Sequence, residues 1–260
     1  MSLPIWTPGA LRSEARPREG SCWRLVEAQH RVSTMKLVDT LDEQALLEEE
    51  LEKTKPPLPV ECRHLDYLLA TPFRYGRYPG NSRFRREGYS PGVFYGAELV
   101  ETAVAETAFY RLLFFAESPD TPWPKNALEF TAFAAAFRTE RAIDLMVAPF
   151  NAQRSDWTRL DDYSACLALA DAANAAEIEL VRYESVRDPK HGANIALLTC
   201  NAFPKTKPLR FATWRLFLSD YGASALCDMP DARLSFPLAV FADDPRMMAL
   251  VGLKAGNDEV

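Results

Sequence analysis

Residues 92–116 read Gly92-Val-Phe-Tyr-Gly-Ala-Glu-Leu-Val-Glu-Thr-Ala-Val-Ala-Glu106-Thr-Ala-Phe-Tyr-Arg-Leu-Leu-Phe-Phe-Ala116. The run over 92–96 is short, apolar and bounded by glycines, which predicts a β-strand. From residue 99 onward, apolar side chains recur at the three- and four-residue spacing of a helix. They are Val100, Val104, Ala108, Leu112 and Phe115. The sequence therefore predicts a strand that leads directly into a helix over 99–116 with one buried face.

Further elements are predicted on both sides of this unit. After an irregular lead-in over 1–21, a first strand is expected over 22–27. A helix follows, because Thr40-Leu-Asp-Glu43 is a capping box and leucines recur until Pro56-Pro57, with an acidic run on its solvated face. Later strands are predicted over 128–137, 143–147, 178–183, 194–199, 209–217 and 234–241, and an alanine-rich helix over 163–176. Many strands with segregated helices indicate an α+β fold.

The composition is that of an ordinary globular protein. Of 260 residues, 48% are hydrophobic and 25% are charged, so the chain can bury a substantial core. No internal repeat or linker interrupts it, which favours a single domain over 1–260, with its core over about 22–241 and peripheral segments at 1–21 and 243–260. The net charge of −6 argues against a direct nucleic-acid partner or an anionic membrane surface.

The sequence also predicts where the protein resides. Its most apolar stretch is shorter than the roughly 18 residues of a membrane helix, and its first residues lack the pattern of a signal peptide. Five scattered cysteines without a C-x-x-C spacing favour reduced thiols and therefore a cytoplasmic location. No metal is expected, because the single C-x-H at Cys62–His64 has no evident further ligands.

The dinucleotide-fold, P-loop, α/β-hydrolase and zincin motifs are absent. The strongest sign of a binding site is the segment Arg74-Tyr-Gly-Arg-Tyr-Pro-Gly-Asn-Ser-Arg-Phe-Arg-Arg86. Its five arginines are suited to bidentate capture of phosphate, and its aromatic side chains to stacking on bases, so a nucleotide matches both. The alternative for any one arginine is a solvated side chain or an ion pair with the acidic helix.

Two other places carry groups suited to chemistry. Glu106 has mostly apolar helical neighbours, and Tyr95 lies eleven residues earlier, at the end of the predicted strand. The polar loop over 183–194 follows another strand and offers Ser185, Arg187, Asp188 and Asn194. The plain alternatives are an exposed glutamate, a core tyrosine and a simple turn at Asp188-Pro189.

An ordered series of short motifs resembles the RES-domain proteins over residues 22–241. The motifs are Tyr67–Tyr75, Ser82–Phe84, Gly92–Tyr95, Thr102–Glu106, Tyr110-Arg111, Asp144-Leu145, Pro149-Phe150, Tyr183–Pro189, Gly192–Asn194 and Thr213-Trp214. The series looks most similar to the ParT-like branch of RES toxins, which are the toxic halves of bacterial toxin–antitoxin pairs. The resemblance implies an Xre-type antitoxin protein as partner.

The resemblance further implies a fold similar to ADP-ribosyltransferases, with two small packed β-sheets and flanking helices. It also implies an activity on NAD+, which is consumed as a substrate without a metal. The family's arginine, tyrosine, glutamate and serine fall on Arg83, Tyr95, Glu106 and Ser185. Arg85 is a departure from many relatives and is the alternative to Arg83.

These positions imply the following roles. Arg83, or Arg85, holds the diphosphate, and Tyr95 stacks against nicotinamide or ribose. Glu106 stabilises the charge that develops on the ribose, as in glycoside hydrolysis. Ser185 orients the nicotinamide ribose, and Asn194 completes the NAD+ site.

The fate of ADP-ribose is open at this stage. Transfer to a host protein, a mono-ADP-ribosyltransferase activity, is the first hypothesis, because the ParT-like branch suggests a modifying toxin. NAD+ degradation by a glycohydrolase or a phosphorylase is the alternative. A remote third hypothesis, an RNA-binding module built on the arginine and aromatic segment, is disfavoured by the acidic net charge.

Overall fold

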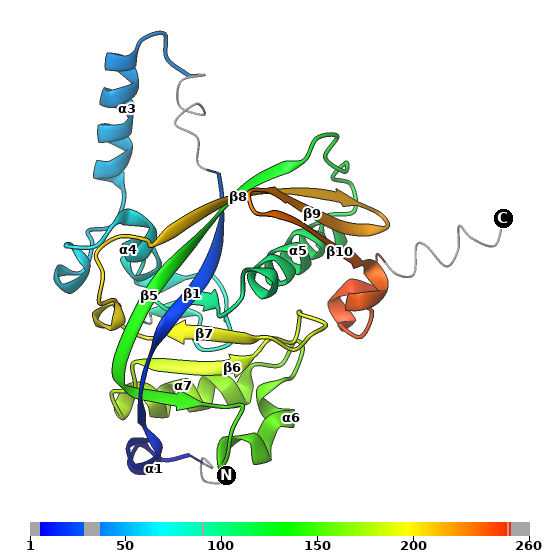
Figure 1. Cartoon of the computed structure of the whole chain (residues 1–260). Helices are drawn as coiled ribbons and strands as arrows, with labels where there is room; N and C mark the ends of the chain where they lie inside the picture. The colour runs from blue at the N-terminus through cyan, green and yellow to red at the C-terminus, as the bar shows by residue number, and fades with distance from the viewer. Residues whose placement is uncertain (1–5, 29–36, 90, 249, 251–260) are drawn as a thin grey trace.

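The computed structural model describes residues 6–28, 37–89, 91–248 and 250. Its main feature is an eight-stranded sheet in the order β1-β4-β7-β6-β5-β8-β9-β10 (Figure 1). The strands are β1 (Arg16–Glu27), β4 (Phe94–Ala97), β5 (Leu128–Asp144), β6 (Leu180–Glu184), β7 (Ala193–Leu197), β8 (Arg210–Ser219), β9 (Gly222–Asp228) and β10 (Asp231–Pro237). A separate ribbon joins β2 (Arg77–Tyr78) to β3 (Gly88–Tyr89). The mixture of this sheet with segregated helices confirms the α+β class.

The long strand β5 organises the sheet. It pairs with β1 from Phe130 to Ala142, with β8 along its first half and with β6 at its end. Because β1 also pairs with β4, the strands β1, β4, β7, β6 and β5 close into a ring. The expected division into two small sheets therefore needs correction: the strands are hydrogen-bonded into one continuous sheet. The strands expected over 128–137 and 143–147 are both parts of β5, whose charged middle residues face solvent.

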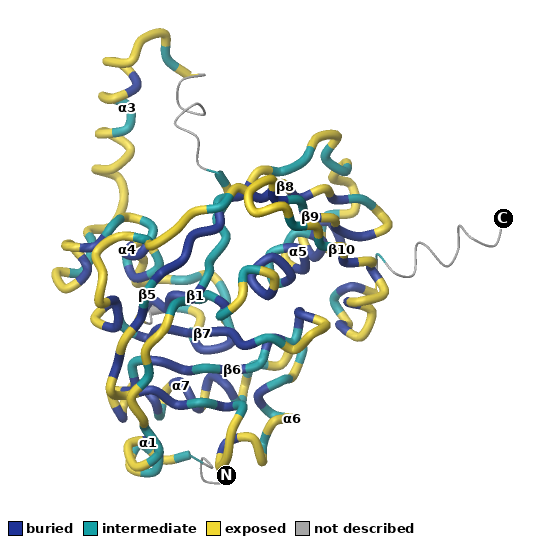
Figure 2. Tube along the Cα trace, in the orientation of Figure 1, coloured by how far each residue is buried: buried dark blue, intermediate teal, exposed yellow. Residues whose placement is uncertain are grey.

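Helices cover the sheet at three places. The helix α5 (Val100–Glu117) packs on β5, β8, β9 and β10 around buried residues such as Phe109, Leu112 and Trp214. The helices α1 (Pro8–Glu14) and α7 (Ser164–Ala175) share a second core cluster with β6, and α4 (Tyr67–Arg74) belongs to a third with β4 and β7. The short α6 (Arg154–Trp157) precedes α7. Figure 2 shows β7 buried along its length, and each of its five residues is buried.

The ends of the core differ from the sequence prediction. Residues 8–14 form a helix and residues 16–21 belong to β1, so the expected irregular lead-in is wrong there. Leu11 and Met247 are both fully buried, which extends the core beyond the expected 22–241. The predicted strand over 234–241 ends at Pro237, and β9 was missed. Residues 1–5 and 251–260 of the expected peripheral segments lie outside the described residues.

The acidic helix is confirmed as α3 (Leu41–Thr54). Its N-terminus is a complete capping box, in which the Thr40 hydroxyl accepts from the Glu43 N–H and the Glu43 carboxylate accepts from the Thr40 N–H. The helix stands away from the sheet in Figure 1 and is mostly exposed in Figure 2. Its acid run is therefore a solvated face, as predicted. No helix in the described part of the chain has the length and apolar character needed to cross a membrane.

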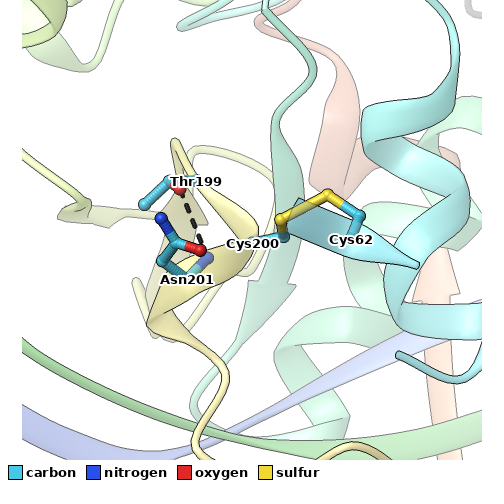
Figure 3. The surroundings of a disulfide bond; sticks show 4 residues. All are labelled: Cys62, Thr199, Cys200 and Asn201. Atoms are coloured by element: carbon cyan, nitrogen blue, oxygen red, sulfur yellow. Dashed lines mark hydrogen bonds between the residues drawn. A yellow bond between two sulfur atoms is a disulfide. The ribbon is translucent and has the colours of Figure 1, made fainter. Parts of the chain in front are cut away.

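The structure joins Cys62 to Cys200 in a disulfide, which contradicts the expectation of reduced thiols (Figure 3). Cys62 ends the 3-10 turn η1 (Val60–Cys62), and Cys200 begins η3 (Cys200–Ala202). The two residues are 138 positions apart, and their Cα atoms lie 5.9 Å from each other. Sequence spacing does not reveal this pair, because only the packing of η1 on η3 brings the two sulfur atoms together. Cys22, Cys166 and Cys227 are free and buried.

Candidate active site

A cleft of about 810 Å³ lies between the strands β1 and β4 and the helix α5. Five of the six site residues predicted from the sequence line it, and Ser185 contacts one of the five. Its arginines outnumber its carboxylates: Arg24, Arg83, Arg85, Arg111, Arg187 and Arg246 against Glu27 and Glu106. This local excess of positive charge suits an anionic ligand, although the chain as a whole is acidic.

Glu106 is the point at which distant segments meet. It lies half-buried on α5, and its Oε1 accepts hydrogen bonds from the Ser185 hydroxyl at 2.7 Å and from the Asn194 amide at 2.6 Å. Both donors are almost fully buried. Among the described residues, no hydrogen bond reaches the Oε2 atom of Glu106. The carboxylate is thus fixed by one oxygen, while the other is left for a ligand.

Ser185 is held by its own loop, directly after β6. Its hydroxyl oxygen accepts from the Arg187 N–H at 3.2 Å and from the Asp188 N–H at 3.0 Å. These two bonds occupy the acceptor positions of the hydroxyl, so its single proton is available for Glu106. Ser185 is therefore oriented before any ligand arrives.

Asn194 reaches the site from the neighbouring strand β7. The register pairs it with Ala97 of β4 on one side and with Tyr183 of β6 on the other. This central position in the sheet makes its backbone rigid. The strand order, which sequence analysis did not supply, is what brings Ser185 and Asn194 to the same carboxylate.

The hydroxyl of Tyr95 holds a loop as well as facing the cleft. It lies 2.9 Å from the Ser82 hydroxyl and accepts from the Phe84 N–H at 3.0 Å. Burial raises the pKa of this phenol above its ordinary value. Tyr95 thus fixes the tight turn over 82–85 that carries both candidate arginines.

The two candidate arginines occupy different environments. Arg83 is buried, and its guanidinium donates to the carbonyl of Trp157 at 2.6 Å and to that of Arg159 at 3.0 Å, over the ring of Tyr163. Arg85 lies over the ring of Tyr78 at 3.7 Å, and its buried Nε atom has no hydrogen-bond partner. An unpaired buried donor is costly unless a ligand satisfies it. The geometry therefore favours Arg85 over Arg83 as the residue that faces an anion.

Arg24 is a cleft residue that sequence analysis missed. It is half-buried, donates to the Tyr95 carbonyl at 2.9 Å and lies over the ring of Phe94. Burial lowers the pKa of its guanidinium, and the nearby charge of Arg85 acts in the same direction. An isolated arginine in the first strand gave no signal, because only the pairing of β1 with β4 places it beside Tyr95.

Other arginines of the segment 74–86 are engaged in ion pairs away from this cleft. Arg74 contacts Glu52 of the acidic helix at 2.5 Å, and Arg86 contacts Asp171 of α7 at 2.5 Å. The ion pair with the acidic helix expected as the plain alternative is thus present for Arg74, whereas Arg86 pairs with a different helix, α7. The segment is therefore not one continuous basic surface, which weakens the RNA-binding hypothesis.

A cluster of aromatic and charged side chains, Tyr110, Tyr163, Arg187 and Arg246, also lines the cleft. Arg187 and Asp244 form a buried ion pair at 2.5 Å, and Arg246 contacts the same carboxylate at 2.9 Å. Burial acts to raise the pKa of Tyr163, but the hydrogen bond with Tyr110 and the charges of nearby arginines outweigh burial and lower that pKa. The two arginines of this cluster are thus already paired within the protein.

Sequence comparison identifies the family. The RES domain profile matches residues 58–219, which is well over half of the chain. The chain belongs to the RES domain family. Of the site residues discussed above, Arg83, Arg85, Tyr95, Glu106, Ser185 and Asn194 lie within this RES match, whereas Arg24 and Arg246 lie outside it.

Other comparisons add little to this assignment. The RES chain is similar to a solved structure described as the M. tuberculosis MbcT–MbcA toxin–antitoxin complex, with 12% sequence identity and a TM-score of 0.45. The likeness covers 80% of this chain and 92% of the other. No curated protein matches the sequence significantly.

Proposed function

We propose that this RES domain cleaves the bond between nicotinamide and ribose in NAD+ and transfers ADP-ribose to an acceptor. The observation that carries the proposal is the arrangement of Glu106. Ser185 and Asn194 hold one oxygen of its carboxylate, and the other is left for a ligand in a cleft rich in arginine. A fixed carboxylate in such a cleft suits a substrate that has phosphates at one end and develops positive charge at the other.

The reaction itself requires little beyond this carboxylate. When the bond between the ribose carbon and the nicotinamide nitrogen breaks, its electron pair leaves with nicotinamide, which becomes neutral. The ribose is left as an oxocarbenium-like cation, as in glycoside hydrolysis. Glu106 stabilises this charge and accepts a hydrogen bond from a ribose hydroxyl through Oε2. An acceptor then adds to the ribose carbon and releases a proton.

Arg85 and Arg24 are the proposed partners of the diphosphate. Both side chains line the cleft beside Tyr95, and within the described part of the chain neither is paired with a carboxylate. Two guanidinium groups match the two phosphates of NAD+ in number, and each can bind phosphate oxygens through two parallel N–H donors. Arg83, in contrast, is used by the backbone carbonyls of Trp157 and Arg159, so we propose that it supports the turn. Tyr95 is proposed to present its ring to nicotinamide or ribose while its hydroxyl holds the turn.

The acceptor is proposed to be a host protein. Tyr110 and Phe114 on the cleft wall formed by α5 are 50% and 49% exposed, so this side of the cleft is accessible to a macromolecule. An enzyme that transfers ADP-ribose must leave the ribose open to the acceptor and must keep water poorly placed. The half-exposed aromatic wall supports transfer over hydrolysis.

The proposed biological role is that of a toxin in a toxin–antitoxin pair. An enzyme that consumes NAD+ or modifies a vital protein in the cytoplasm harms its own host. We therefore propose a protein that acts in the cytoplasm despite its Cys62–Cys200 disulfide, with an Xre-type antitoxin that blocks the cleft. Expression alone should arrest growth, whereas expression of Glu106→Gln should not. Equal tolerance of both proteins by the host would contradict the toxin role.

One experiment separates these activities. The purified protein is incubated with NAD+ labelled either on the adenylate or on nicotinamide, with and without host proteins. Transfer predicts free labelled nicotinamide together with adenylate label on protein. Free ADP-ribose or its phosphate, without labelled protein, would show that the protein degrades NAD+ and does not transfer ADP-ribose. Intact NAD+ in both samples would refute the proposed enzymatic activity.

A further inference from the structure

One helical turn before Glu106, α5 makes a second contact with the loop over 185–192. The Thr102 hydroxyl donates to the Asp188 Oδ2 atom at 2.7 Å. Thr102 is fully buried and Asp188 is 6% exposed, so this bond is shielded from water. Thr102 and Glu106 are four residues apart and therefore lie on the same face of the helix. The loop thus contacts one helix face at two successive turns.

The carboxylate of Asp188 also determines the shape of its loop. Oδ1 accepts from the Lys190 N–H at 2.9 Å, and Oδ2 accepts from the Gly192 N–H at 3.3 Å. A β-carbon at Gly192 would collide with both Thr102 and Asp188, so only glycine permits this close approach. Leu99 at the N-cap position of α5 makes no side-chain hydrogen bond to the start of the helix. The negative charge of Asp188 near the first turn interacts favourably with the dipole of this helix.

We infer that Thr102 and Asp188 are positioning residues for the proposed reaction, an inference that rests on the proposed function. The Asp188 N–H is one of the two donors that orient the Ser185 hydroxyl, and that hydroxyl donates to Glu106. When Thr102 anchors Asp188 to the helix, it sets the distance between Ser185 and Glu106. Loss of the anchor frees the loop to move relative to the carboxylate, although no catalytic group has been removed.

The test compares Thr102→Val, which removes the hydroxyl at nearly constant shape, with Thr102→Ser, which restores it. The matched control is Thr139→Val, because Thr139 is also a buried threonine whose hydroxyl donates to a carboxylate, that of Glu179, and it lies away from the cleft. We expect kcat for nicotinamide release to fall about 10- to 100-fold in Thr102→Val, as for small errors in the placement of reacting groups. KM should change by less than about threefold, since the residues proposed to bind the diphosphate are untouched.

A purely structural role would lower the melting temperature in both valine variants but would leave kcat intact. Thr102→Ser should recover most of kcat, and Thr139→Val should keep it. If Thr102→Val does not fold, Thr102→Ala replaces it, because alanine is the best helix former. In the double variant with Glu106→Gln, the loss should be no larger than in Glu106→Gln alone, because Thr102 acts through that carboxylate.

The outcomes are distinguishable. If the wild-type protein is active and kcat is unchanged in Thr102→Val, the inference is overturned while the proposed function stands. An equal loss of kcat in Thr139→Val overturns it as well, and so does a loss in the double variant that exceeds the loss in Glu106→Gln alone. A wild-type protein that releases no nicotinamide refutes the proposed function, and the inference falls with it.

Discussion

Replacing Glu106 by glutamine tests the centre of the proposed site. Glutamine keeps the shape of the side chain and one oxygen that can accept from Ser185 and Asn194, which donate at 2.7 and 2.6 Å. What it removes is the negative charge. A charge about 4 Å from the developing ribose cation, at an effective dielectric constant of about 20, contributes up to about 4 kcal/mol. That corresponds to a rate factor of about 10³.

The half-buried position of Glu106 exposes it partly to water, which reduces this figure, so we expect kcat to fall by about 10²–10³. KM should change little, because the diphosphate partners are intact. The assay is steady-state release of nicotinamide, with thermal unfolding to confirm the fold. The matched control is Glu98→Gln: Glu98 is a partly buried carboxylate paired with Arg182 and Arg18 outside the cleft. It should lose stability but keep its turnover.

Near-normal turnover in Glu106→Gln would refute the reasoning, because the carboxylate that stabilises the cation would then lie elsewhere. An equal loss in Glu98→Gln would also contradict it, since the effect would then reflect general damage from the loss of a buried charge. A large rise in KM at constant kcat would assign Glu106 to binding of the substrate instead of to the chemical step.

Three further predictions concern binding and stability. Arg85→Lys should raise KM for NAD+ by about tenfold, because lysine keeps the charge but not the planar fork of the guanidinium. Arg83→Lys should chiefly lower the free energy of unfolding, by about 1.5–3 kcal/mol. The opposite pattern would restore Arg83 as the diphosphate partner. Cys62→Ser should lower the free energy of unfolding of the oxidised protein by about 2–4 kcal/mol, measured by denaturant unfolding with and without reductant, because the disulfide closes a loop of 138 residues. Burial acts to raise the pKa of Asp244, but hydrogen bonds from Arg246 and the charges of Arg187 and Arg246 outweigh burial and hold that pKa below its usual value. The contribution of Asp244 to stability is therefore present above about pH 4 and is lost as the pH falls further. The difference in melting temperature between the wild-type protein and Asp244→Asn should therefore be largest near neutral pH and shrink in acid.

The sequence by itself determined the local elements and the chemistry-bearing residues. The spacing of apolar residues located α5 and α7 closely, and the capping box located the start of α3, because helices are specified by neighbours within a few positions. The ordered motifs selected Glu106, Tyr95, Ser185 and Asn194, which the structure brings to one cleft or into direct contact with it. Boundaries were predicted wrongly where charged residues interrupted an apolar run, as in β5, which is one strand where two were expected.

Only the tertiary structure decided how these elements are connected in space. The continuous sheet, the ring closed by β1 and the disulfide between Cys62 and Cys200 all depend on pairings between segments far apart in the chain. The same holds for the choice between Arg83 and Arg85, since both have the same local sequence signal. One guanidinium is used by the carbonyls of Trp157 and Arg159, which lie more than 70 residues away, and the other is left facing the cleft. Local sequence specifies which groups are present, but hydrogen bonds between distant segments determine which of them remain free to bind a ligand.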